Sequence, residues 1–106
     1  MTKAYIRNPG SGKWMPAIIN GYNDINAAVG GYIEAVPLSQ DFTLYCNEEG
    51  KLNDLEPNAY WIVNGRPHDT LVGSLVLMGP VDEDGEDTDA TPEMLTLVDK
   101  HLAFLS

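Results

Sequence analysis

Hydrophobic and polar positions alternate with a period of two in several short segments, which predicts β-strands. The clearest pair is residues 32–38 and 42–46, which flank a three-residue loop at 39–41. A loop this short joins strands that are antiparallel neighbours. The pattern therefore predicts a β-hairpin over residues 32–46.

One register of this hairpin pairs Val36 with Leu44 and Glu34 with Cys46. Its apolar side chains then share one face, which must be buried: Val36, Leu38, Phe42, Leu44 and Cys46. Glu34 falls on the same face, near its open end. A carboxylate buried there without a partner is costly. We therefore expect Glu34 to lie at the rim, to accept backbone amides of the turn at 47–51, or to pair with a cation, for which the candidates are Arg7, Lys51 and Arg66.

Four further segments read as strands. Residues 4–6 and 13–19 form a first hairpin, in which Pro16 requires a sheet edge or a bulge because it cannot donate a ladder hydrogen bond. Residues 59–63 are aromatic and β-branched, which favours a strand over a helix starting after residue 58. Residues 70–78 are largely apolar at the positions that would face either side of a strand, which predicts a central strand covered on both faces. Gly73 within this run indicates a bulge or a close contact.

Helical spacing appears twice. Residues 23–30 predict a helix of about two turns that Gly30 ends as a C-cap glycine. Residues 92–104 predict a C-terminal helix that begins at a proline, with one apolar stripe: Met94, Val98, Leu102 and Leu105. The whole chain, residues 1–106, is thus expected to be a single α+β domain with a small, mostly antiparallel sheet of about four to six strands.

The charge changes this picture, because 16 acidic residues face 6 basic ones and give a formal net charge of −10. Such a surface repels nucleic acid and anionic membranes, and it suits a partner protein with a basic surface. Six carboxylates are concentrated in a loop at 82–91, which we expect to be flexible and to form an acidic interaction surface: Asp82, Glu83, Asp84, Glu86, Asp87 and Asp89.

Candidate chemistry is sparse. Glu34, Glu48 and Glu49 form the one carboxylate cluster that the hairpin would assemble, and paired carboxylates can serve acid–base catalysis. Cys46 follows an apolar strand and precedes acids, which predicts a buried, inert thiol. His68 and His101 lack metal-ligand spacing. The sequence predicts no metal site and no cofactor. A single cysteine and the absence of a signal-peptide pattern indicate the cytoplasm.

Two segments resemble a known family. Residues 29–34 (VGGYIE) and 44–52 (LYCNEEGKL) are similar to domain of unknown function 3846, a family common in phages, plasmids and actinobacterial genomes. The resemblance implies a mobile-element origin and an intracellular protein, but no reaction. It singles out as candidate binding residues Tyr32, Glu34, Tyr45, Asn47, Glu48, Glu49 and Asn58, together with the glycines Gly30 and Gly31.

Three functions compete at this stage. The leading hypothesis is a non-enzymatic protein of a phage or mobile element that binds and modulates a host or defence protein, in the manner of an acidic DNA mimic. The first alternative is a binder of a small nucleotide signal, with base stacking on aromatic side chains: Tyr32, Tyr45, Tyr60 and Trp61. The second is an enzyme that uses the Glu34, Glu48 and Glu49 carboxylates. Any of the three is compatible with a homo-oligomer.

Overall fold

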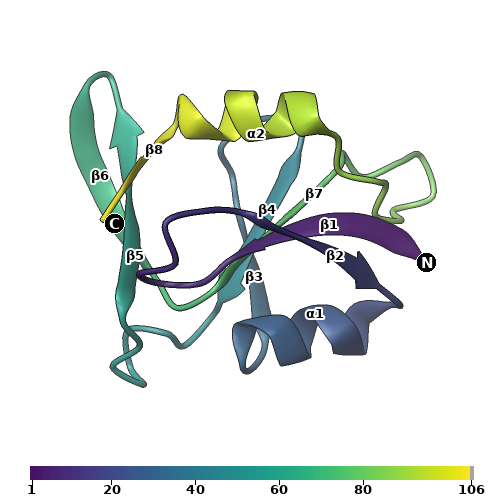
Figure 1. The fold of residues 1–106 in the computed structure, drawn as a ribbon, viewed down its shortest axis with the longest axis horizontal. Coiled ribbons are helices and arrows are strands. Elements are labelled where there is room, and N and C mark those ends of the chain that lie inside the picture. Colours follow the sequence, from purple (N-terminus) through teal and green to yellow (C-terminus); the bar gives the residue numbers. More distant parts are fainter. Residues whose placement is uncertain (106) are drawn as a thin grey trace.

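The computed structural model describes residues 1–105, which form two antiparallel sheets and two helices (Figure 1). The first sheet has the strand order β2-β1-β7-β4-β3, and the second has the order β6-β5-β8. The strands are β1 (Thr2–Arg7), β2 (Met15–Ile19), β3 (Ile33–Val36), β4 (Thr43–Asn47), β5 (Pro57–Val63), β6 (Arg66–Val72), β7 (Leu75–Met78) and β8 (Leu102–Phe104), and the helices are α1 (Tyr22–Val29) and α2 (Pro92–Asp99). The α+β class and the antiparallel pairing are as predicted.

The five-stranded sheet is the middle layer of the fold. Helix α1 packs on one of its faces, while α2 and the three-stranded sheet cover the other. Strand β7 contributes to both interfaces, because Val76 and Met78 pack in the α1 cluster while Leu75 and Leu77 pack in the opposite one. Its side chains are all buried, which is the consequence of a central strand with both faces covered.

The predicted hairpin and first helix are confirmed. Strands β3 and β4 pair in the expected register, with Val36 opposite Leu44 and Glu34 opposite Cys46. Helix α1 ends at Gly30, which adopts a left-handed conformation with φ of 79°. Pro16 lies in β2, an edge strand of the five-stranded sheet, which is where a residue without an N–H is tolerated.

The prediction of one strand over residues 70–78 is wrong. Strand β6 ends at Val72 in the second sheet, and β7 begins at Leu75 in the first. Gly73 makes the corner between them with φ of 76°, and a Cβ at this position would lie 2.8 Å from Leu55 Cδ1. The close contact expected at Gly73 is therefore present, and it marks a change of sheet within a continuous apolar run.

The C-terminal helix is shorter than predicted. It ends at Asp99, and Leu102–Phe104 form β8, which pairs with β5. Leu102 is buried and fits the helical spacing from Val98, but it fits a strand equally well. The strand prevails because β5 offers a free edge whose backbone groups β8 satisfies, and because Phe104 then packs beneath Arg7, whose Cζ lies 3.7 Å from the ring centroid.

Candidate functional site

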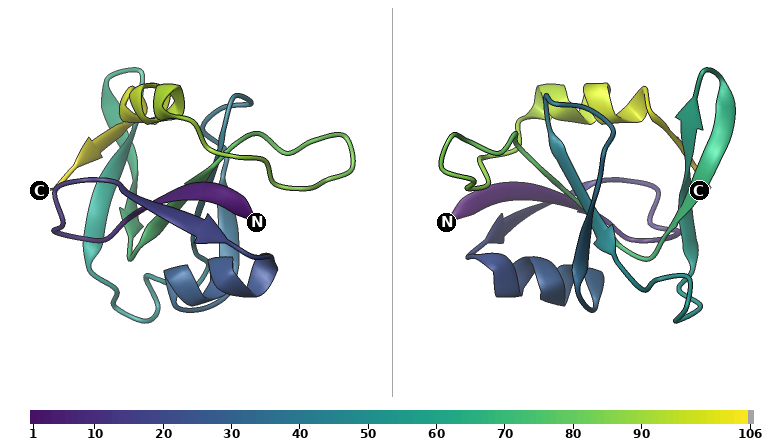
Figure 2. Two further views of the ribbon diagram at one scale, coloured as in Figure 1. Left: turned by 45° about the vertical axis from the view of Figure 1, so that its right-hand side comes forward. Right: turned by 180° about the vertical axis from the view of Figure 1, so that it is seen from behind.

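A pocket of about 240 Å³ opens between the β3–β4 hairpin and the second sheet. Seen from behind, the hairpin lies in front and the β5–β6 pair stands beside it (Figure 2, right). The floor is apolar, with Val36, Leu71 and Val72. The polar and aromatic residues of its lining are Glu34, Cys46, Asn47, Glu48, Lys51, Trp61, Asp69 and Thr70.

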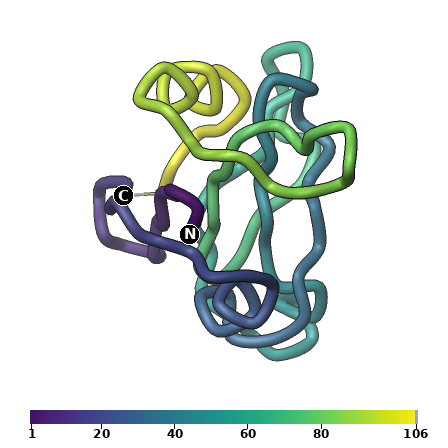
Figure 3. The backbone as a smooth tube through the Cα atoms, turned by 90° about the vertical axis from the view of Figure 1, so that its right-hand side faces the viewer, coloured from purple at the N-terminus to yellow at the C-terminus, as the bar shows by residue number. Residues whose placement is uncertain are grey.

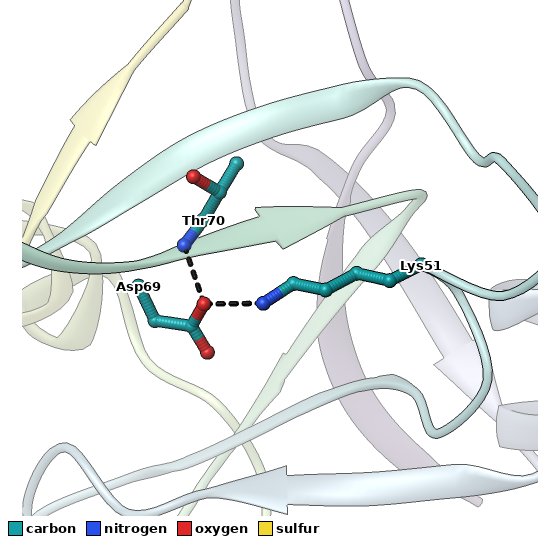
Figure 4. A network of polar contacts seen from close by, with 3 residues as sticks. All are labelled: Lys51, Asp69 and Thr70. Atoms are coloured by element: carbon teal, nitrogen blue, oxygen red, sulfur yellow. Dashed lines mark hydrogen bonds and ion pairs between the residues drawn. The ribbon is translucent and has the colours of Figure 1, made fainter.

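The structure shows how the Glu34 carboxylate is accommodated on the apolar face of the hairpin. Glu34 is exposed and lies at the rim of the pocket, one of the arrangements expected for it. Lys51, a predicted partner of Glu34, instead forms an ion pair with Asp69 (Figure 4). No hydrogen bond or ion pair joins the Glu34 side chain to another residue of the described chain 1–105.

Asp69 is held in place from two sides. It pairs with Lys51 and accepts a hydrogen bond of 2.8 Å from the backbone N–H of Thr70 (Figure 4). The hydrogen bond from Lys51 is the main reason that the pKa of Asp69 is lowered. Asp69 therefore stays ionised and adds a third carboxylate to the pocket, beside Glu34 and Glu48.

Cys46 lies on the same pocket wall, buried as the sequence predicted. Burial, then the negative charges of Glu34 and Asp69, raise its pKa to about 11 against the weaker opposing effect of Lys51. The thiol is therefore protonated at neutral pH and is not an activated nucleophile.

The predicted carboxylate cluster forms only in part. Glu34 and Glu48 line the pocket, whereas Glu49 does not. Within residues 1–105, no three His, Cys, Asp or Glu side chains are grouped so that they could hold a metal ion. Asp69 is the member that the sequence analysis missed, because its position depends on how the two sheets pack.

Asn47, a candidate binding residue, holds helix α1 against β4. It is buried, and its amide group donates a hydrogen bond of 3.0 Å to the carbonyl of Val29 and accepts one of 2.8 Å from the N–H of Glu49. A Cβ at Gly31 would lie 2.9 Å from Asn47 Nδ2, so a glycine there leaves room for this side chain. The side chain of Asn47 therefore serves mainly to connect the end of α1 to β4 and the turn that follows it.

Asn58 makes a second such connection, between the two sheets. It is 2% exposed, and its Nδ2 donates to the carbonyls of Arg7 at 2.8 Å and of Gly73 at 2.9 Å. It thus ties β5 to the end of β1 and to the corner between β6 and β7. The sequence does not distinguish an asparagine that donates to buried carbonyls from one that is available to bind a ligand.

The aromatic side chains proposed for base stacking are not assembled at one place. Trp61 lines the pocket, while Tyr32 is exposed outside it. Tyr60 is adjacent to Trp61 on β5 and so faces the other side of the sheet. Tyr45 donates a hydrogen bond of 2.7 Å to Asp87. Burial is the main reason that the pKa of the Tyr45 hydroxyl is raised, and this hydrogen bond is the second.

The acidic loop 82–91 projects from the molecule and faces the viewer in Figure 3. Three of its carboxylates hold its shape. Asp82 accepts the N–H groups of Asp84 and Glu86 at 2.9 Å each. Asp87 accepts the Tyr45 hydroxyl, and Asp89 accepts the N–H of Lys3 at 2.8 Å. The side chains of Glu83, Asp84 and Glu86 are exposed.

A family model described as domain of unknown function (DUF3846) matches residues 1–103. The chain belongs to this family. The match extends well beyond the hairpin segments that suggested it, and it takes in the first hairpin, the acidic loop and α2. No curated protein and no solved structure matches the chain.

The DUF3846 description assigns no activity, so the site must be interpreted from its own chemistry. Three carboxylates, one ammonium group and an apolar floor suit the binding of a positively charged group. The protonated thiol of Cys46 supplies no nucleophile. No helix within residues 1–105 is long and apolar enough to cross a membrane.

Proposed function

We propose that this DUF3846 domain is a binding protein that docks its acidic surface on a basic surface of another protein. The observation that supports this most is the excess of unneutralised carboxylates. The chain has 16 acidic residues, yet within residues 1–105 the one ion pair is that of Lys51 with Asp69. A negative field of this size accelerates encounter with a basic partner.

The acidic loop is the part best prepared for docking. Asp82 accepts two backbone N–H groups within the loop, while Asp87 and Asp89 tie the loop to Tyr45 of β4 and Lys3 of β1. Glu83, Asp84 and Glu86 are exposed on this loop. These hydrogen bonds restrain a loop that the sequence predicts to be flexible, and a restrained binding element loses less conformational entropy on association. A basic groove that normally holds nucleic acid is the surface that such a loop would fit.

In biological terms, the proposal is a phage or mobile-element protein that acts in the host cytoplasm on a host or defence protein, as a mimic of DNA. We expect neither nucleic acid nor anionic membranes as direct partners, because both would be repelled by the acidic surface. The mimicry has a specific consequence, since DNA added in excess must displace the domain from its partner.

The proposal is tested by affinity capture from bacterial lysate at low and at high salt. We expect a partner that is retained at low salt, released at high salt, and displaced by duplex DNA. A variant with Glu83→Gln, Asp84→Asn and Glu86→Gln should lose it. A control with equal charge loss outside the loop, Asp41→Asn, Glu56→Gln and Glu93→Gln, should retain it.

Two results would contradict the proposal. Capture of no protein at low salt would remove protein docking as the function. Equal retention by the loop variant and its control would show that the loop is not the docking element, and retention in excess DNA would exclude the mimicry.

A further inference from the structure

A second pocket adjoins the first. It has a volume of about 500 Å³ and lies between the end of the hairpin, the β5–β6 turn and the chain between α2 and β8. Pro37 and Trp61 line both pockets, so the two meet at these side chains. We call the combined surface the Trp61 groove. Together the pockets reach the size range of ordinary small-ligand sites.

The two ends of the Trp61 groove carry opposite charge. The first pocket holds the carboxylates of Glu34, Glu48 and Asp69, of which Asp69 alone has a cationic partner. The second pocket holds Lys100 and His101 and no acidic residue. Lys100 is exposed, and its ammonium group forms no hydrogen bond or ion pair with another residue of the chain 1–105.

The centre of the groove is apolar and held in position. Trp61 is half-buried and belongs to β5, where Asp69 of β6 and Leu102 of β8 flank it. His68 packs edge-on against its ring, with 4.6 Å between centroids. An indole fixed in this way offers an apolar surface to a ligand at little cost in side-chain entropy.

We propose that the Trp61 groove binds a short peptide that carries a free ammonium group at one end and a free carboxylate at the other. The ammonium lies with Glu34 and Glu48, the chain crosses Trp61, and the carboxylate lies with Lys100 and His101. A purely anionic ligand would meet the carboxylates of the first pocket, and a purely cationic one would leave Lys100 unmatched.

This site is independent of the proposed docking function. In Figure 1, the β5–β6 pair and the acidic loop lie at opposite ends of the molecule. The groove and the loop therefore do not share side chains. Failure of peptide binding would leave the outcome of the affinity capture unchanged.

The test is a titration of the 15N-labelled protein with alanine di- to pentapeptides at low salt, followed by NMR. We expect saturable shifts of the Trp61 indole N–H and of the amides near Glu34 and Lys100, strongest for one peptide length. The same peptide with its N-terminus acetylated, or with its C-terminus amidated, should bind about tenfold more weakly or worse.

Two single variants test the two ends. Glu34→Gln and Lys100→Gln should each weaken binding about tenfold, and the matched control Glu83→Gln on the acidic loop should leave it unchanged. The spectra of the variants report whether each is folded. The proposal is overturned if no peptide gives saturable shifts, if a blocked peptide binds as tightly as the free one, or if Glu83→Gln weakens binding as much as Glu34→Gln.

Discussion

Two groups of residues that the family resemblance singled out use polar side chains in opposite ways: the seam between the layers, formed by Asn47 and Asn58, and the rim of the first pocket, formed by Glu34 and Glu48. In the seam, Asn47 and Asn58 are buried and their amide groups are satisfied by backbone groups. At the rim, Glu34 and Glu48 are exposed and line an open pocket. The resemblance therefore does not indicate a shared role for these residues, and the two regions should respond differently to substitution.

The largest effect is expected in the seam at Asn58. Replacement by alanine removes two hydrogen bonds and leaves the buried carbonyls of Arg7 and Gly73 without this donor. We expect the free energy of unfolding, measured by urea denaturation, to fall by about 3 kcal/mol. A loss below about 1 kcal/mol would show that the seam does not depend on this side chain.

The second-largest effect is expected at Gly31, which lies against the side chain of Asn47. Gly31→Ala places a methyl group against Asn47 Nδ2 and should lower the free energy of unfolding by about 2 kcal/mol. In an Asn47→Ala background the same change should cost much less, because the obstructing amide is gone. A double-mutant cycle measures this coupling, and strict additivity would contradict the contact.

A smaller effect is expected at alkaline pH from Cys46, where the pocket meets the core. Its pKa in the folded protein is raised to about 11. A raised pKa stabilises the fold below the ordinary thiol pKa, and this contribution is lost as the pH rises through about 11. Stability should therefore fall less steeply above pH ~9 in a Cys46→Ala variant. An identical slope in both proteins would contradict the shift.

The smallest effect is expected at the rim. Glu34→Gln removes a charge that has no partner among residues 1–105, so the free energy of unfolding should change by less than about 0.5 kcal/mol. Urea denaturation beside Asn58→Ala makes the contrast direct. A loss comparable to that of Asn58→Ala would remove the distinction between the two regions.

The parts of the fold that depend on neighbouring residues were predictable from the sequence. Helix α1 and the register of the β3–β4 hairpin follow from local spacing, a C-cap glycine and a short loop. The division into two sheets was not predictable, because the run over residues 70–78 stays apolar through the Gly73 corner. Strand β8 was missed because it depends on the free edge of β5, about forty residues earlier in the chain.

The candidate site shows the same limit. Glu34 at the end of the hairpin face was identified from alternation alone. Its pocket partners Trp61 and Asp69, and Lys100 in the adjoining pocket, come from distant segments that meet only through packing. Asn47 and Asn58 were proposed as binding residues, because sequence gives the type of a polar group but not the groups that satisfy it.

The place of β7 at the centre of the first sheet has a consequence for the order of assembly. The pairs β1–β2 and β3–β4 are local, but they touch the same sheet only through β7, which follows both in the chain. On a ribosome, the two hairpins emerge first, and they cannot be paired into one sheet until residues 75–78 have also emerged. We therefore expect a late, cooperative collapse, in which one four-residue strand determines when the domain becomes protected from proteases and from chaperones.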